Sequence, residues 1–358
     1  MESEKVEVEF WNLSIPLTPP LKAGRGLITN TYVLLIFVAD RNENRGIGYS
    51  SFRGEAELDQ ATHIAKDLAA KAGFHLPGLI NVERLESNGA STSQLTSSRS
   101  AANALSLAAW DFAGKRSNST CADLWGRPPN RNSIECYASA FWLDKSIDQL
   151  KAEAKEHKQR NYKLVKMRVG KSIPDSLERI AAVQEVYREP RTIALETGFG
   201  WTVDLTNQFL KEAPGEYLWI EDPVSYEKMG SIDKKSRNSV GAGEKCEMAS
   251  ELFKLYMTGG IRKIILDVQY LGGPVRFLEA ARSLNALGAT VGAHRFSHYS
   301  IHLLASLPKS LPIEMLDWTN PALIPISGPD KSGECPVLGP GFSIALNQSV
   351  IDDFGRRI

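Results

Sequence analysis

From about Ile134 onward, short apolar runs alternate with helical stretches of ten or more residues. Eight of these runs resemble strands: Glu135–Ala138, Leu164–Val169, Thr192–Leu195, Tyr217–Ile220, Val240–Gly243, Lys263–Val268, Thr290–Ala293 and Pro312–Met315. This alternation predicts βα units and a parallel sheet, and intervals of roughly 20–30 residues are close to those of a (β/α)8 barrel. A doubly wound open sheet is the alternative, although its usual glycine-rich phosphate-binding sequence is missing after the early strands.

The first third of the chain has strands followed by helices. We expect strands at Lys5–Asn12, Asn30–Asp40 and Gly46–Ser51, and helices at Glu57–Gly73 and Ser98–Gly114. The sequence therefore predicts an N-terminal α+β domain over residues 1–130 and a barrel over 131–326. The glycine- and proline-rich segment 327–358 is expected to return over the surface or toward the first domain.

Composition excludes several classes of partner. The chain is 42% hydrophobic and 23% charged with a formal net charge of zero, so it lacks the basic surface of a nucleic-acid-binding protein. No apolar run approaches the roughly 20 residues of a membrane span, and the N-terminus has no signal-peptide core. The four scattered cysteines are typical of free thiols in a reducing compartment. We expect a cytoplasmic protein that forms a homo-oligomer, with a small-molecule partner and neither nucleic acid nor membrane.

Ionisable side chains mark every barrel strand from the second onward. Barrel enzymes carry their chemistry at the carboxyl ends of the strands. The series consists of Lys166 and Arg168 on one strand, then Glu196, Glu221, Glu244, Asp267, His294 and Glu314. Any one of these residues could be a solvated strand end, but a series on consecutive strands indicates a functional site.

Glu196, Glu221 and Glu244 lie on consecutive strands and would converge on the rim of the barrel. Three carboxylates in one place repel one another unless a cation compensates them. Hard oxygen ligands favour Mg²⁺, with Mn²⁺ as a substitute, whereas a zinc site would normally include cysteine or histidine. The alternative is that each carboxylate pairs separately with a nearby cation, as Lys245 could with Glu244.

Asp267 and His294 follow neighbouring strands on the other side of this proposed metal site. A carboxylate bonded to one imidazole nitrogen fixes the tautomer and raises the basicity of the other nitrogen. His294 is therefore a candidate general base. His298 and His302 are four residues apart, but no third ligand is near, so we interpret them as surface or supporting residues.

This ordered set of motifs resembles the enolase superfamily and, within it, the mandelate racemase-like group. The motifs are AANALSLAAWDFAGK before the barrel, KMR at 166–168, the three glutamates, DVQYLGGP around Asp267, and His294 with Glu314. The resemblance implies an α/β fold in which an α+β capping domain covers a (β/α)7β TIM-like barrel.

The resemblance also implies the chemistry of the site. Glu196, Glu221 and Glu244 would bind Mg²⁺, and the proton α to a substrate carboxylate would be removed to give an enediolate. Lys166 would face the carboxylate. Glu314 would hydrogen-bond its other oxygen from the side opposite the metal, for which it must be protonated or share a proton.

Two motifs depart from the family pattern. The first metal ligand is usually aspartate but is Glu196 here, with Gly198 in place of the common polar residue two positions later. The usual Lys-x-Lys is Lys166-Met-Arg168, and arginine, with a pKa above about 12, is a poor base.

Racemisation needs a competent base on each face of the substrate, whereas dehydration needs one. We therefore expect a Mg²⁺-dependent sugar-acid dehydratase that forms a 2-keto-3-deoxy acid, with His294 as base and acid and Arg168 as an electrostatic clamp. The alternatives are a racemase or epimerase of a 2-hydroxy acid, with Arg168 as an unusual base, and an inactive metal-binding scaffold.

Two segments of the first domain are expected to be loops that close over the distal end of the substrate, Pro16–Arg25 and Tyr49–Arg53. Their cations Lys22, Arg25 and Arg53 could bind a second carboxylate or could be solvated. Trp142, just past the first barrel strand, could form a pocket wall or could serve packing alone.

Overall fold

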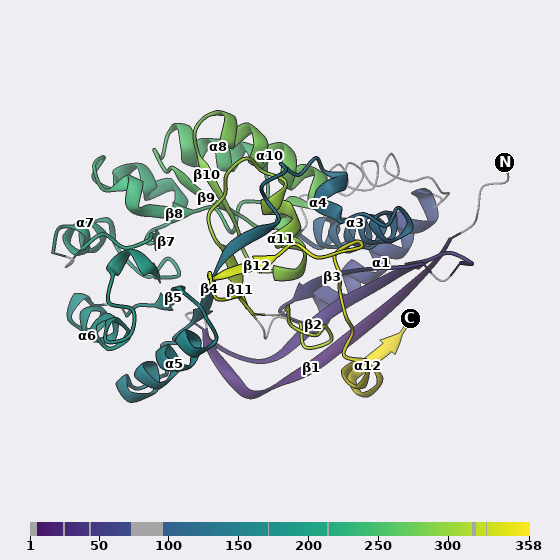
Figure 1. The fold of residues 1–358 in the computed structure, drawn as a ribbon, viewed down its shortest axis with the longest axis horizontal. Coiled ribbons are helices and arrows are strands. Elements are labelled where there is room, and N and C mark those ends of the chain that lie inside the picture. The colour runs from purple at the N-terminus through teal and green to yellow at the C-terminus, as the bar shows by residue number, and fades with distance from the viewer. Residues whose placement is uncertain are drawn as a thin grey trace.

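The computed structural model describes residues 6–23, 26–42, 44–72, 96–170, 172–212, 215–316, 320–326 and 328–358, and the side chains of residues 19, 21–23, 26, 71 and 72 lie outside this description. An antiparallel sheet with two long helices lies beside a barrel of parallel strands (Figure 1). No described helix is both long and apolar enough to span a bilayer.

The antiparallel sheet belongs to the capping domain and is buried on both faces. Its strands are β1 (Glu7–Ala23), β2 (Gly26–Ala39), β3 (Arg45–Phe52) and β13 (Gly355–Arg357), in the order β13-β1-β2-β3. Leu34, Ile36 and Val38 of β2 pack toward α1 (Glu55–Ala72) and α3 (Thr96–Arg116). The alternate residues Val33, Leu35 and Phe37 join the core that continues into the barrel, as the two-residue period of a strand requires.

Helix α3 lies directly on β3 because two glycines leave room for it. A Cβ atom at Gly46 would lie 2.1 Å from the carbonyl oxygen of Ala108, and one at Gly48 would lie 2.1 Å from that of Ala104. The alanines of α3 are the matching feature, since they allow the helix backbone to approach the strand. This contact explains why the helix predicted at 98–114 is rich in small residues.

The two capping segments predicted as loops are mostly strand in their described parts, so the loop prediction was wrong for Pro16–Ala23 and Tyr49–Phe52, whereas Arg53 lies just past the end of β3. β1 continues through Pro16 to Ala23 and pairs with β2, with a register shift between Pro16 and Leu21. Among the described residues, β13 pairs with Trp11–Leu13 of β1, so β1 is an edge strand beyond Leu13. The prolines in this part of β1 therefore remove no hydrogen bond to a second neighbouring strand. The second segment enters β3, which runs to Phe52.

The eight parallel strands of the barrel are all present, with ends within three residues of those predicted. They are β4 (Ser133–Ala140), β5 (Leu164–Arg168), β6 (Ile193–Glu196), β7 (Ile220–Glu221), β8 (Val240–Ala242), β9 (Lys263–Leu266), β10 (Thr290–Ala293) and β11 (Ile313–Met315). β11 pairs with β4, and a parallel bridge between Val291 and Ser310 connects β10 to the segment that enters β11. The (β/α)7β TIM-like barrel with an α+β capping domain is therefore confirmed.

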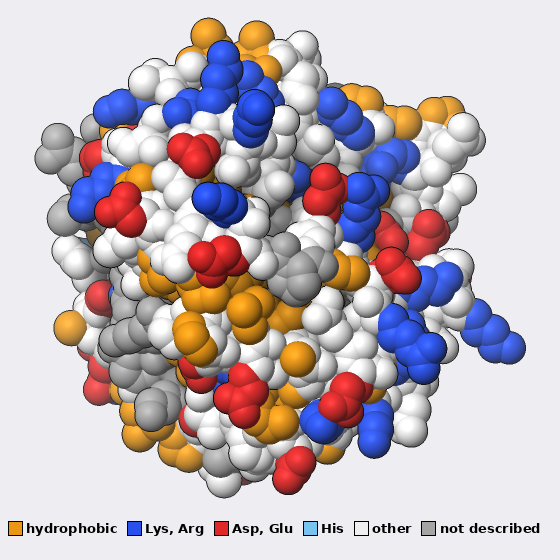
Figure 2. All heavy atoms as spheres, turned by 90° about the vertical axis from the view of Figure 1, so that its left-hand side faces the viewer, with side chains coloured by type: hydrophobic (Ala, Val, Ile, Leu, Met, Phe, Trp, Pro, Cys, Tyr) orange, Lys and Arg blue, Asp and Glu red, His pale blue; other side chains and the backbone are white. Residues whose placement is uncertain are grey.

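Helices lie between the barrel strands along the chain. They are α5 (Ile147–Gln159), α6 (Ile173–Gln184), α7 (Val203–Glu212), α8 (Ala249–Met257), α9 (Val268–Leu271), α10 (Pro274–Ala286) and α11 (Ser297–Ala305). The connection from β7 to β8 contains the 3-10 turns η2 (Tyr226–Ser231) and η3 (Arg237–Ser239). Charged side chains of both signs are interspersed over the face in Figure 2.

An apolar layer fills the barrel interior below the ionisable side chains. Leu164, Ala194 and Trp219 belong to this layer together with Tyr137, Ile265 and Leu311. Each of the first three lies two residues before an ionisable residue, namely Lys166, Glu196 and Glu221. Since side chains two apart share a face of a strand, these three ionisable residues also point into the barrel.

The last part of the chain contacts both parts of the molecule. β12 (Glu334–Pro336) pairs antiparallel with β4, and after α12 (Gln348–Phe354) strand β13 pairs with β1. The helix α4 (Cys121–Leu124) precedes the barrel. The domain limits at residues 130 and 326 stay a prediction.

Candidate active site

Lys166 occupies the centre of the ionisable layer. Its side chain is only 1% exposed, and its Nζ lies 2.7 Å from Glu221 Oε1 and 2.9 Å from Glu314 Oε1. Glu196 Oε2 lies 3.4 Å from the same nitrogen. Burial by itself would lower the pKa of Lys166, but Glu221 and Glu314 outweigh burial and hold the pKa well above its usual value. Lys166 is therefore a fixed positive charge among carboxylates.

Glu196, Glu221 and Glu244 come together as a possible metal site. Each offers a carboxylate oxygen, and these oxygens lie within 4.8 Å of one another. Glu196 ends β6, Glu221 ends β7, and Glu244 follows β8. An all-carboxylate set at this spacing fits a hard divalent cation such as Mg²⁺ or Mn²⁺.

The carboxylates of this group also have cationic neighbours, although Glu196 and Glu221 share Lys166 instead of pairing separately. Glu244 has cationic partners of its own. It forms ion pairs with Lys245 and, at 3.2 Å, with His294 Nε2. Burial raises the pKa of Glu221 to about 7, with Lys166 opposing the rise. Burial would also raise the pKa of Glu244, but His294 and Lys245 hold it well below its usual range. A divalent cation beside Glu221 would stabilise its charged form.

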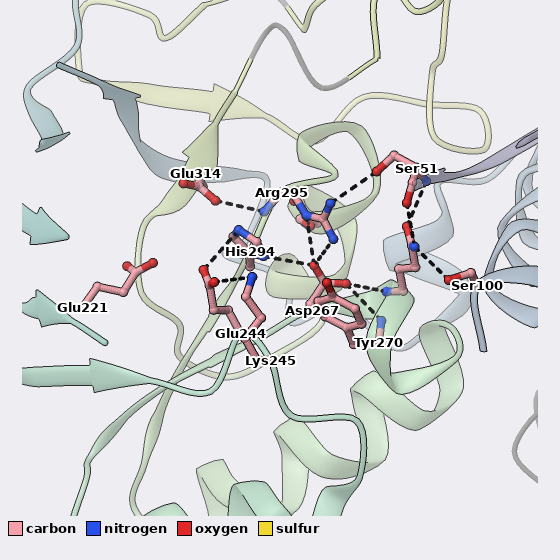
Figure 3. Close-up of polar contacts among 12 residues, drawn as sticks. Ser51, Ser100, Glu221, Glu244, Lys245, Asp267, Tyr270, His294, Arg295 and Glu314 are labelled. Carbon is pink, nitrogen blue, oxygen red and sulfur yellow. Dashed lines mark hydrogen bonds and ion pairs between the residues drawn. The ribbon is translucent and has the colours of Figure 1, made fainter. Parts of the chain in front are cut away.

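Asp267 and His294 form the predicted carboxylate–imidazole pair (Figure 3). His294 Nδ1 lies 3.0 Å from Asp267 Oδ2, which leaves Nε2 on the side of Glu244. Asp267 is fully buried, and burial would raise its pKa, but the charge of Arg295 and the contact with His294 lower it to about 2. Asp267 is therefore ionised and holds the imidazole by the nitrogen that does not face the centre of the site.

Glu314 of β11 differs from the prediction in its charge. Its Oε2 accepts a hydrogen bond from the backbone N–H of Arg295 at 2.9 Å, and its Oε1 pairs with Lys166. Burial would raise the pKa of Glu314, but Lys166 and His294 lower it to about 2. The protonated or proton-sharing form expected from the resemblance is therefore not the form that this arrangement favours. Lys166, not Glu314, is the donor available here.

Arg168 lies at the edge of the site and is held by several partners. Its Nη1 donates to Ser139 Oγ at 3.0 Å and to the carbonyl oxygen of Ala140 at 3.2 Å, and its Nη2 lies 3.0 Å from Glu196 Oε2. Its guanidinium carbon lies 4.0 Å from the ring centroid of Trp142. Trp142 thus packs on Arg168, an arrangement compatible with both predicted roles of this tryptophan.

The predicted distal cations are not brought into this cluster by the described contacts. Arg53 is exposed, and its backbone N–H donates to Glu57 Oε2 at 3.2 Å. The side chain of Lys22 and all of Arg25 lie outside the described residues. Their role in binding a substrate carboxylate stays a prediction.

The two other candidate histidines do not join the site. His302 is buried and packs against Phe342, which excludes the surface alternative for this residue and leaves the supporting one. His298 Nε2 lies 2.8 Å from the carbonyl oxygen of Ile324. Neither contact is with a metal-ligating side chain.

Sequence reasoning missed two residues of the site, each of which directly follows a residue that it identified. Arg295 follows His294 and donates to Asp267 Oδ2 from Nε and Nη2. Asp222 follows Glu221, has a left-handed φ of 44°, and has neither carboxylate oxygen hydrogen-bonded to a described residue. Burial and Glu244 raise the pKa of Asp222. Adjacency was the only signal for either residue.

Known proteins share this architecture. The family described as Enolase C-terminal domain-like matches residues 149–350, which is more than half of the chain. A 3,6-anhydro-alpha-L-galactonate cycloisomerase from Streptomyces coelicolor is 22% identical over 317 residues, covering 85% of this chain and 86% of that protein. An L-Lys-D/L-Arg epimerase from Desulforapulum autotrophicum is 22% identical over 241 residues, covering 66% and 67%.

Among solved structures, an L-talarate dehydratase from Polaromonas sp. JS666, complexed with Mg and L-glucarate, superposes with a TM-score of 0.86. The two sequences are 22% identical, and the superposition covers 99% of both chains. At this identity the likeness shows the fold. Membership of the family is shown by the sequence match over residues 149–350. The chain belongs to the enolase superfamily, in its mandelate racemase-like group.

Proposed function

We propose that this protein is a Mg²⁺-dependent dehydratase of a sugar acid. The observation that carries the proposal is the asymmetry of the two candidate bases. His294 has one nitrogen bonded to Asp267 and the other directed toward Glu244. Arg168, which occupies the position of the second base, is paired with Glu196 and donates to Ser139. Because a guanidinium stays protonated near neutral pH, one face of the substrate has a competent base and the other does not.

The metal ion would be held by Glu196, Glu221 and Glu244, whose oxygens lie within 4.8 Å of one another. When bound, it would supply positive charge that stabilises the carboxylate as negative charge develops on it. Lys166 would donate to a carboxylate oxygen of the substrate and supply a second fixed charge. Arg168 would bind the carboxylate or a neighbouring hydroxyl.

His294 would perform both proton transfers. Nε2 would take the proton from the carbon next to the carboxylate, and the electron pair of the broken C–H bond would form an enediolate. The same nitrogen would then return its proton to the departing 3-hydroxyl, so that the C–O bond breaks and water leaves. The resulting enol converts to the 2-keto-3-deoxy acid. Each step uses one histidine on one face, which is the asymmetry described above.

Similarities to known proteins support both this proposal and its rival. The neighbouring L-talarate dehydratase structure contains Mg and L-glucarate, which supports acid-sugar chemistry. The similarity to an L-Lys-D/L-Arg epimerase supports the second candidate, proton removal and return without elimination. An epimerase would require Arg168 or a bound water to act on the second face.

A screen of acid sugars in D₂O with Mg²⁺, repeated with EDTA, distinguishes the candidates. The assay follows 2-keto acid formation and deuterium at the α-carbon in the same samples. Metal-dependent keto acid from a subset of the acids is the expected result. Deuterium exchange without keto acid would instead favour an epimerase. If neither product forms from any acid while Mg²⁺ binds, two explanations are left, a substrate outside the library or a metal-binding scaffold without turnover.

A further inference from the structure

Arg295 connects the predicted base to the capping domain. We propose that Arg295 is a positioning residue which, together with Ser51 of the capping sheet, holds Asp267 in place and thereby aligns His294 for proton transfer. The inference rests on the proposed function, because it explains how His294 is aligned for that chemistry. It assigns the capping sheet a part in orienting the base.

Asp267 is fixed by donors at both of its oxygens (Figure 3). Oδ1 accepts from the backbone N–H groups of Gln269 and Tyr270 at 2.8 and 3.1 Å, which caps helix α9. Oδ2 lies 3.0 Å from His294 Nδ1 and accepts from Arg295 Nη2 at 2.8 Å and Nε at 3.2 Å. The Arg295 fork therefore holds the same oxygen that orients the imidazole. Without Arg295, His294 would be the remaining partner of Oδ2. The carboxylate group could then rotate while Oδ1 stays bonded to the backbone of α9.

Arg295 is itself held from three elements. Its backbone N–H donates to Glu314 of β11, its guanidinium binds Asp267 after β9, and its Nη1 donates to Ser51 Oγ of β3 at 3.3 Å. Its backbone is left-handed, with φ of 56°, as is that of Phe296, with φ of 51°. Two successive non-glycine residues in this conformation persist only where the surroundings over-determine them. The turn after β10 is therefore built to place this side chain.

The capping strand reaches Asp267 by a second route. The backbone N–H of Ser51 donates to Gln269 Oε1 at 3.0 Å, and Gln269 Nε2 donates to the carbonyl oxygen of Ser51 at 2.9 Å. Gln269 Nε2 also donates to Ser100 Oγ of α3 at 2.8 Å. Gln269 lies in α9, the helix that Asp267 caps. A shift of β3 would therefore act on Asp267 both through Arg295 and through α9.

A purely electrostatic role for Arg295 makes a different prediction. Charge alone would be supplied equally well by lysine. An ammonium group cannot present two N–H groups to one carboxylate oxygen while a third reaches Ser51, because it lacks the planar fork of arginine. Arg295→Lys therefore separates positioning from charge, and Arg295→Gln removes both. Arg282→Gln is the control, since Arg282 is a barrel arginine that donates to the Trp125 carbonyl oxygen.

The first test measures turnover of an acid identified in the screen described above, with Mg²⁺ saturating. We expect Arg295→Gln and Arg295→Lys each to lower kcat by about tenfold or more with KM changed less than about threefold, as for other residues that orient a catalytic group. Ser51→Ala should lower kcat by a smaller factor in the same way. Wild-type kcat in Arg295→Lys, or a change in KM alone, would overturn the proposal.

The second test needs no substrate. In protein labelled with ¹⁵N-histidine, the Nδ1–H signal of His294 is assigned by its loss in His294→Ala. We expect a protected signal in the wild type and in Arg282→Gln, and a broadened or lost signal in Arg295→Gln, Arg295→Lys and Ser51→Ala. An absent wild-type signal, or one unchanged in all variants, overturns the positioning role. If no acid in the screen reacts, this measurement still decides the inference, because it needs no turnover.

Discussion

Arg168 Nη2 lies 3.0 Å from Glu196 Oε2, so two of the residues that depart from the family pattern are in direct contact. The longer acid at 196 meets the longer cation at 168. The pair is partly buried, with side chains 12% and 19% exposed, so solvent weakens the interaction without removing it. This contact indicates that the two departures belong together rather than being separate losses.

The contact predicts that the two positions are energetically coupled. Glu196→Asp and Arg168→Lys should each lower Mg²⁺ affinity and turnover, because each substituted side chain is too short to keep the contact with its unchanged partner. The double variant, which restores the family's aspartate and lysine, should lose less than the sum. Isothermal titration with Mg²⁺ gives the coupling free energy, expected at about 1–3 kcal/mol. Strictly additive losses would mean that the residues act independently.

Lys166 should matter for stability as well as chemistry. Lys166→Met leaves Glu221, Glu314 and Glu196 without the buried cation that they share. Removing one partner of a buried ion pair costs about 3–5 kcal/mol, and Mg²⁺ should recover part of this loss by replacing the charge. Urea unfolding with EDTA and then with Mg²⁺ measures both effects.

Lys151→Met is the matched control for this experiment, because Lys151 is a more exposed lysine paired with Glu185. It should leave the free energy of unfolding nearly unchanged, with or without Mg²⁺. Equal stability of the two variants in EDTA would contradict the role assigned to Lys166.

The low pKa of Asp267 predicts a specific acid dependence. The pKa is about 2 in the folded protein, below its usual value of 3.8, so the ionised form stabilises the fold. That contribution is present above the unfolded-state pKa and is lost as pH falls from about 4 through about 2. It amounts to about 2–3 kcal/mol at full strength.

Urea unfolding of the wild type and Asp267→Asn at about pH 6 and about pH 2.5 checks this expectation. The stability difference between the two proteins should shrink at the lower pH. A difference that stays constant would show that the charge of Asp267 does not stabilise the fold.

The close approach of α3 to β3 predicts a packing effect far from the site. Gly48→Ala places a methyl group 2.1 Å from the Ala104 carbonyl oxygen, so the helix must move away from the strand. We expect a loss of about 1–3 kcal/mol in the free energy of unfolding, or more. Gly54→Ala is the control, because nothing lies within 4 Å of a Cβ atom there. Similar effects from both substitutions would contradict the proposed packing.

Much of the fold was predictable because it depends on local patterns. Each barrel strand is a short apolar run, and alternation along β5 already placed Lys166 and Arg168 on one face. The extension of β1 past Pro16 was not predictable, since prolines at 16, 19 and 20 are typical of loops and only the pairing with β2 makes the segment a strand.

Side chains whose partners lie far along the chain were the hardest part of the site to predict. In the sequence, Gln269 is only a polar residue in a short helix. Its role becomes visible in the structure, where Ser51, 218 positions earlier, lies beside it. Arg295 likewise becomes informative only when Asp267 and Ser51 are known to surround it. The proximity of Glu196, Glu221 and Glu244 was predictable because these residues lie at or just after the ends of consecutive strands.

The pairing of β13 with β1 has a consequence for protein engineering. Gly355 and Arg357 lie opposite Leu13 and Trp11, and the backbone N–H of Ile358 donates to the carbonyl oxygen of Phe10 at 2.9 Å. The capping sheet thus combines strands from the first 52 residues with a strand from residues 355–357. A chimaera that exchanges caps between relatives through a single crossover near residue 130 would receive the sheet without its own border strand. Transplanting the complete cap calls for two crossovers, one on each side of the barrel.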